Sequence, residues 1–221
     1  NAELGHLSRR QAAAIAAAAI EVARGDHDAQ FPVDVFQTGS GTSSNMNANE
    51  VIAALARRAG VEDVHPNDHV NLGQSSNDVI PTSIQVAAAL AVRESLRPAL
   101  KHLRKTIARR ASQLRKVIKT GRTHLMDAMP LSFGQEFSGW AAQLERVQER
   151  LDDTQRRLLR LPLGGTAIGT GINADPKFAG RACAALSKHS GLKFRPAENA
   201  FEGIAAQDAA VELSGQLNTL A

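Results

Sequence analysis

The sequence predicts an almost wholly α-helical protein, and three observations support this. Alanine dominates several segments, such as residues 11–20 and 86–92, and aromatic residues make up only 4% of the chain, with no tyrosine. Apolar residues also recur at alternating steps of three and four through two long segments, which is the helical period. This composition favours helices over β-sandwiches or barrels. With 221 residues and 43% hydrophobic content, the chain can bury a core in one or two domains.

The first part of the chain predicts two helices and two irregular stretches. A helix over residues 9–24 ends at Gly25, and a loop over residues 26–37 contains Pro32. A second helix is expected at about residues 47–59, ending at Gly60, followed by a stretch rich in Asp, Asn and His. We place a domain boundary near Asp68. It separates an N-terminal helical domain, residues 1–68, from a central helical-bundle domain, residues 69–221.

Beyond Ser75 the pattern becomes that of long helices. The first carries Pro98, which lacks an N–H group and is expected to kink the helix. The second has nearly strict a/d spacing over residues 133–158, and residues 203–221 again predict a helix. Such apolar seams must be buried against other helices, and a chain of this length offers few, so oligomerisation is expected.

Charge and cysteine content bound the possible partners. The net charge of +4 and the pI near 9.6 raise nucleic acid as a partner. The basic residues between Lys101 and Lys116 are nevertheless interleaved with leucines, as on the solvated side of an amphipathic helix, so no nucleic-acid binding is expected.

Cys183 is the only cysteine, which excludes an internal disulfide and fits a reducing cytoplasm. No apolar run approaches the roughly 20 residues of a membrane span, so no membrane association is expected.

Three polar stretches each precede a helical pattern: GSGTSSN at residues 39–45, SSND at 75–78 and TGRTH at 120–124. Their hydroxyls, amides and free backbone N–H groups can converge at helix N-termini, where anions are stabilised. This favours a small polycarboxylate as ligand. Such residues are also ordinary caps and turns, so each stretch alone has a purely structural interpretation. Histidine is the side chain most readily used for proton transfer near neutral pH, which makes His124 the candidate for that role in the third stretch.

Two further stretches predict no cofactor. His65, Pro66, Asn67, Asp68 and His69 match no helical zinc pair and have no third ligand cluster, so they predict a turn and no metal. The glycine-rich residues 163–171 contain no G-x-G-x-x-G after a strand, so they predict a mobile or tightly packed connector rather than a dinucleotide site.

Taken in order, five motifs resemble those of the class II fumarase family, within the fumarase/aspartase superfamily. They are TGSGTSSNMNANE at residues 38–50, HPND at 65–68, SSND at 75–78, GRTHL with Asp127 and Ala128 at 121–128, and GGTAIGTG at 164–171. The similarity runs through essentially all 221 residues. His124 discriminates within the superfamily, because aspartate ammonia-lyases typically carry Gln at the matching place.

The resemblance implies an all-α fold and reversible hydration of fumarate to L-malate in the tricarboxylic acid cycle, with no metal or other cofactor. It implies His124 as a catalytic residue and His65, Asn67 and Asp68 as a secondary anion site. The substrate-site residues it implies are Ser40, Thr42, Ser75, Ser76, Asn77 and Thr123.

The resemblance also implies a homotetramer whose active sites are shared between subunits. The family carries a later Ser-rich signature loop that nothing in this sequence matches. By resemblance the chain also lacks the start of the N-terminal domain, the rest of the bundle and the C-terminal domain, so we expect these 221 residues alone to be inactive.

Two alternatives stay open. One is a sister lyase that releases fumarate from aspartate or argininosuccinate. The other is a non-catalytic helical assembly protein that keeps the scaffold for packing alone, since the seam of residues 133–158 supports assembly equally well in either case.

Overall fold

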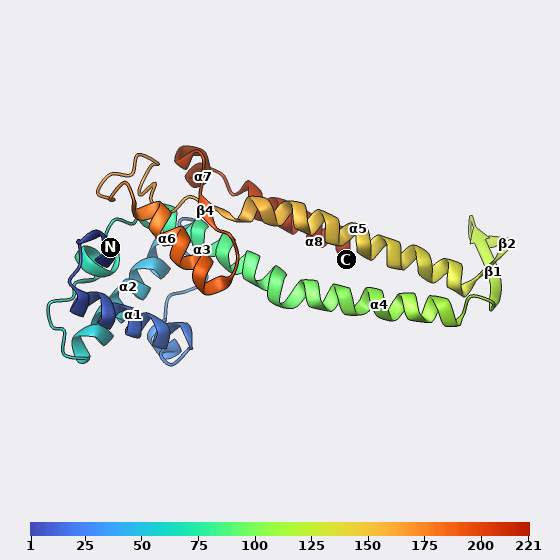
Figure 1. The fold of residues 1–221 in the computed structure, drawn as a ribbon, viewed down its shortest axis with the longest axis horizontal. Helices are drawn as coiled ribbons and strands as arrows, with labels where there is room; N and C mark the ends of the chain where they lie inside the picture. Colours follow the sequence, from blue (N-terminus) through green and yellow to red (C-terminus); the bar gives the residue numbers. More distant parts are fainter. The chain divides into compact units, whose positions relative to one another are not determined.

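The computed structural model describes all residues, 1–221, and confirms the helical prediction (Figure 1). Two small two-stranded sheets accompany eight helices. The helices are α1 (Arg9–Ala23), α2 (Thr42–Arg58), α3 (Ser76–Ala91), α4 (Arg97–Gln113), α5 (Phe133–Leu158), α6 (Phe178–Ser190), α7 (Ala200–Ala205) and α8 (Asp208–Leu220). The strands are β1 (Ile118–Thr123), β2 (Met126–Ser132), β3 (Arg160–Leu161) and β4 (Arg195–Pro196). No helix combines the length and the apolar character needed to cross a membrane.

The chain forms two compact units, which are described separately. The first comprises Asn1–Gln85 and Leu159–Gln207, and the second Val86–Leu158 and Asp208–Ala221. Asp68, near which the sequence predicts a domain boundary, lies inside the first unit. The boundary near Asp68 between an N-terminal and a central domain therefore stays a prediction.

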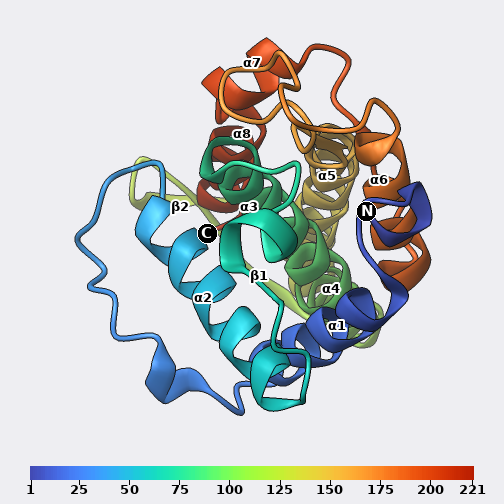
Figure 2. The ribbon, with the colours of Figure 1, turned by 90° about the vertical axis from the view of Figure 1, so that its left-hand side faces the viewer.

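In the first unit, α1 and α2 pack against each other (Figure 2). The helix α1 begins with a capping box, because Ser8 Oγ accepts from the N–H of Gln11 at 3.1 Å while Gln11 Oε1 accepts from the N–H of Ser8 at 3.2 Å. It ends before Gly25, which has a φ of +83°, as the sequence predicts. The core of this pair consists of the small buried side chains Ala53, Ala56, Val61 and Val64.

The helix α2 begins at Thr42, five residues before its predicted start. Gly41 provides the turn that opens it, with a left-handed φ of +62°. Ser43, Ser44 and Asn45 have the chemistry of loop and cap residues, which explains why the sequence pattern alone assigns them to a loop. Asn45 and Asn49 are nevertheless buried on one face of this helix, so tertiary contacts override the local preference.

The long helical run after Ser75 changes its hydrogen bonding just before Pro98. Residues Val92–Leu96 form a π-helical turn, η4, in which the N–H of Arg97 bonds the carbonyl of Val92. Pro98 has no N–H to offer the carbonyl of Glu94, and a π-helical turn at this position accommodates that missing bond. The disturbance expected from Pro98 therefore takes the form of η4.

In the second unit, α4 and α5 lie side by side and are joined by the β1–β2 hairpin (Figure 1). The polar residues 120–123 lie in β1, and the sequence pattern does not predict β2. Leu100, Val147, Leu151 and Leu158 are buried, which agrees with the predicted seam. Nearer the start of α5 the apolar seam is not fully covered, because Trp140 keeps 48% of its surface exposed.

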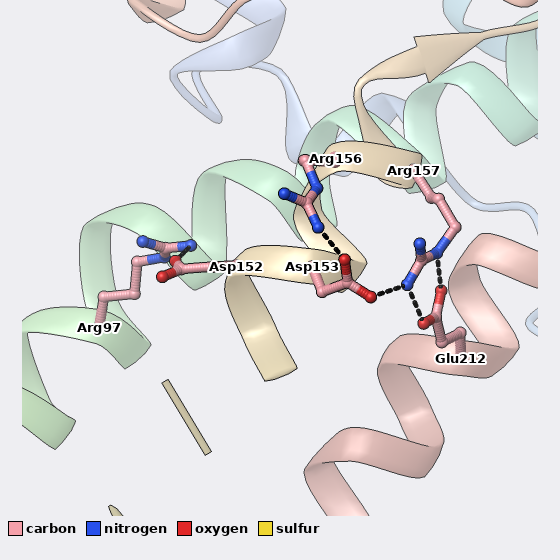
Figure 3. A network of polar contacts seen from close by, with 6 residues as sticks. All are labelled: Arg97, Asp152, Asp153, Arg156, Arg157 and Glu212. Atoms are coloured by element: carbon pink, nitrogen blue, oxygen red, sulfur yellow. Dashed lines mark hydrogen bonds and ion pairs between the residues drawn. The ribbon is translucent and has the colours of Figure 1, made fainter. Parts of the chain in front are cut away.

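The prediction of one helix over residues 203–221 is wrong, because α7 and α8 are separate. Ala206 has an extended backbone, with φ −113° and ψ 142°, and ends α7. Asp208 then lies in the first turn of α8, where the helix dipole favours a negative charge. Figure 3 shows how α8 is tied to α5: Arg157 bonds both Asp153 and Glu212.

Candidate functional site

The N-termini of α2 and α3 meet at a close contact in the first unit. A Cβ at Gly41 would lie 2.9 Å from Cδ1 of Ile80, so a larger residue would have to displace the Ile80 side chain as well as adopt a left-handed φ of +62°. Directly beside this contact, the hydroxyls of Thr42 and Ser76 lie 2.9 Å apart. The structure thus brings together two of the predicted substrate-site residues, each in the first turn of its helix, where free backbone N–H groups stabilise anions.

A layer of asparagine amides supports these hydroxyls. Asn45 donates to Ser76 Oγ at 2.9 Å and to Asn71 Oδ1 at 3.4 Å. Asn49 also donates to Asn71 Oδ1, at 3.2 Å. Asn45 and Asn49 are each only 7% exposed. Asn49 and Asn71 are missing from the sequence prediction, although the spacing of four between Asn45 and Asn49 indicates a shared helix face.

Ser75 and Asp78 cap the start of α3. The N–H of Asn77 donates to Ser75 Oγ at 3.3 Å, and the N–H of Ser75 donates to Asp78 Oδ1 at 2.9 Å. Asp78 is fully buried, at 0% exposed. Burial raises the pKa of the Asp78 carboxyl, although the backbone N–H donors around it act in the opposite direction.

The glycine-rich loop is a tightly packed connector, one of the two forms that the sequence predicts. The N–H groups of Gly164 and Thr166 donate to Asp78 Oδ2 at 2.9 and 2.8 Å. Asn77 Nδ2 donates to the carbonyl of Ala167 at 2.7 Å. Thr166 is 3% exposed and has a φ of +57°, a strain of about 1–3 kcal/mol for a β-branched residue. The loop is therefore held against the start of α3 by hydrogen bonds between its backbone and the side chains of Asn77 and Asp78.

The remaining residues of the first unit have local contacts. Ser40 is exposed, and its hydroxyl lies 3.0 Å from that of Thr38. His65 Nδ1 accepts from the N–H groups of Asn67 and Asp68, at 3.3 and 3.2 Å, and so caps the short π-helical turn η3 (Pro66–Val70). The turn that the sequence predicts is present, and the side chain of His65 caps it. Asn67 and Asp68 are exposed.

Thr123 and His124 belong to the second unit. Thr123 ends β1 and pairs with Met126, so His124 and Leu125 alone connect the two strands. Both connecting residues are left-handed, with φ of +50° and +61°, as a type I′ hairpin turn requires. Asn and Gly usually fill such positions, and left-handed non-glycine residues are enriched at functional sites. The imidazole of His124 is exposed to solvent.

No group of three or more His, Cys, Asp or Glu side chains is arranged to hold a metal ion. Apart from the buried Asp78, the side-chain polar groups described at the starts of α2 and α3 are neutral hydroxyls and amides. Neutral donors of this kind bind carboxylate or phosphate oxygens.

Comparison with known proteins matches the chain to one family model and to relatives that share one description. A family model described as lyase matches residues 1–221. A protein of Xylella fastidiosa described as class II fumarate hydratase is 65% identical over 221 residues, which are 100% of this chain and 47% of the relative. A protein of Corynebacterium glutamicum with the same description is 53% identical over 222 residues, again covering 100% of this chain and 47% of the relative.

A solved structure is similar over the same extent. The class II fumarase of Schistosoma mansoni matches with a TM-score of 0.97 at 39% identity, covering 100% of this chain and 50% of that chain. The chain thus spans about half the length of the relatives it matches.

Proposed function

The chain belongs to the lyase family whose model matches residues 1–221, and on that premise we propose that the protein acts as a class II fumarate hydratase. This enzyme adds water reversibly to fumarate and gives L-malate. The observation that carries the proposal is the 65% identity of the whole chain to a relative of that description.

The chemistry of the site supports the proposal. Removal of a proton beside a carboxylate builds an aci-carboxylate dianion, whose charge must be stabilised as it develops. The hydroxyls of Thr42 and Ser76, 2.9 Å apart at two helix N-termini, are neutral donors that the fold holds in place before substrate binds. Such preorganised donors stabilise the dianion more than they stabilise the substrate.

We assign the residue roles on the same basis. His124 moves a proton, since its exposed imidazole is free to reach a partner group. His65, Asn67 and Asp68 form a secondary anion site. The substrate carboxylates are bound by the hydroxyls and amide of Ser40, Thr42, Ser75, Ser76, Asn77 and Thr123.

We further propose a homotetramer with active sites shared between subunits. Two observations support assembly: Trp140 and Leu103 keep 48% and 46% of their surfaces exposed on α5 and α4, and such large apolar side chains favour burial against another helix. The mass of the full gene product in solution, measured by light scattering, tests the tetramer. The single free cysteine, Cys183, fits a reducing compartment such as the cytoplasm.

A substrate comparison tests the proposed reaction. The full gene product is offered L-malate, L-aspartate and argininosuccinate in turn, and the ultraviolet absorbance of newly formed fumarate is followed. Signal with L-malate alone is the expected result. Signal with L-aspartate alone would assign the protein to the sister ammonia-lyases and remove the discriminating role of His124.

A further inference from the structure

Asp78 joins two segments that are far apart in the sequence. Its Oδ1 accepts from the N–H of Ser75 at 2.9 Å, and its Oδ2 accepts from the N–H groups of Gly164 and Thr166 at 2.9 and 2.8 Å. The donors in the glycine-rich loop lie 86 and 88 residues further along the chain. A helix cap needs only the first of these contacts. The other carboxylate oxygen thus serves a different purpose.

The two joined segments also touch through a side chain of the site. Asn77 follows Ser75 and Ser76, and its Nδ2 donates to the carbonyl of Ala167 at 2.7 Å. This bond fixes which way the Asn77 amide faces. The loop is also packed closely against α6, because a Cβ at Gly164 would lie only 2.7 Å from Cβ of Ala179.

We propose that Asp78 is a positioning residue of the active site: it holds the glycine-rich loop against Ser75–Asp78 so that Ala167 keeps the amide of Asn77 oriented toward the substrate. The proposal rests on the proposed function, because it takes Asn77 as a substrate-binding residue. Asp78 itself is 0% exposed, so it acts through its neighbours and does not touch substrate.

The geometry indicates an informative substitution. An asparagine at position 78 has nearly the same size, but only one of its two terminal atoms accepts hydrogen bonds. Its NH₂ group must therefore face either the N–H of Ser75 or the N–H groups of Gly164 and Thr166. In Asp78→Asn, the NH₂ group therefore faces an N–H donor of one of the two segments. The hydrogen bonds to that segment are lost, and the segment is released.

Kinetics of the full gene product test the proposal. Asp78→Asn is compared with Val64→Ala, which removes buried volume from the α1–α2 core of the same unit, and with Asp26→Asn, which removes an exposed carboxylate. KM and kcat for L-malate are measured well below the melting temperature of every variant. Asp78→Asn is expected to raise KM and to lower kcat/KM by about tenfold or more, since misplacement by 1 Å costs on the order of 10²-fold. Val64→Ala is expected to melt earlier with kinetic constants like those of the unchanged protein.

Kinetic constants of Asp78→Asn that match those of Val64→Ala would overturn the proposal and leave Asp78 a structural residue. If Asp78→Asn does not fold, Gly164→Ala takes its place. The φ of +99° at this position disfavours alanine, and the added Cβ would lie 2.7 Å from Cβ of Ala179, so the N–H of Gly164 is expected to move away from Asp78 and KM to rise severalfold. An unchanged KM in Gly164→Ala would also overturn the proposal.

A binding measurement separates this proposal from the proposed reaction. Affinity for succinate, an unreactive dicarboxylate, is measured by calorimetry for the same variants. Absence of turnover in the unchanged protein would refute the hydratase assignment alone. Equal succinate affinity in the unchanged protein and Asp78→Asn would refute the positioning role alone.

Discussion

Arg157 of α5 donates two hydrogen bonds to Glu212 of α8, from Nε to Oε2 and from Nη2 to Oε1, each 2.6 Å long (Figure 3). Two parallel bonds between a guanidinium and a carboxylate are the strongest arrangement of this pair. Arg157 also bonds Asp153 on its own helix at 2.6 Å. This network fixes α8 along α5 within the second unit.

Glu212→Gln is expected to destabilise the protein by at most about 1 kcal/mol, because both side chains remain partly in water. Arg157 lowers the pKa of the Glu212 carboxyl. The stabilisation is thus present while Glu212 is ionised and is lost as pH falls through its folded pKa. Denaturant unfolding should separate the two proteins at pH 7 and bring them together only at a pH below the folded pKa of Glu212, which lies under the ordinary glutamate value of about 4.3. A difference that persists at low pH, or that the exposed Glu62→Gln reproduces, would contradict this.

His124→Asn in the full gene product is expected to lower turnover by roughly 10²-fold or more, the usual contribution of a general acid or base. The melting temperature should hardly change. His124 is exposed and has a φ of +50°, a conformation that Asn adopts more readily than His. Fumarate absorbance and thermal unfolding are the measurements. A large loss of stability with unchanged turnover would make His124 a structural residue.

Ser76→Ala is expected to weaken both stability and substrate binding. Its hydroxyl accepts from Asn45 at 2.9 Å, and the next acceptor for that amide, on Asn71, lies at 3.4 Å. Loss of one such bond costs about 0.5–1.5 kcal/mol, and KM for L-malate should rise. Ser43→Ala is the matched control, since Ser43 is an exposed hydroxyl one residue after Thr42. Equal KM values for the two variants would remove Ser76 from the site.

Gly41→Ala is expected to destabilise the first unit by about 1–3 kcal/mol, because its φ is +62° and its new Cβ meets Ile80 at 2.9 Å. Gly39→Ala has open space around the added Cβ and should change stability by only a few tenths of a kcal/mol. Denaturant titration of the pair provides the measurement. Equal stability of the two variants would show that Gly41 is not needed for the approach of α2 to α3.

The family and the helical fold are predicted from the sequence, and the comparisons confirm both. The helical period locates α1 and α5 almost to the residue, because their apolar faces repeat regularly and clear end signals, such as Gly25, bound them. The start of α2 and the break before Asp208 are missed. At the start of α2, the burial of Asn45 and Asn49 overrides the local preference of these residues for a loop.

The sequence predicts which polar residues belong to the candidate site, but it does not predict how they are arranged in space. The roles of Thr42, Ser76 and His124 remain predictions, although the hydroxyl contact of the first two is an observed feature. Asp78 is recognisable in the sequence only as a cap three residues after Ser75. Its partners Gly164 and Thr166 cannot be found from local patterns, since 86 and 88 residues intervene.

The hairpin that carries His124 limits how this part of the chain can vary during evolution. Since only His124 and Leu125 connect β1 to β2, an inserted residue either lengthens the turn or shifts the strand register. A shift by one residue would turn Thr123 to the opposite face of the ribbon. Insertions and deletions among homologues should therefore collect elsewhere, for example in the exposed residues 32–36, and spare this turn.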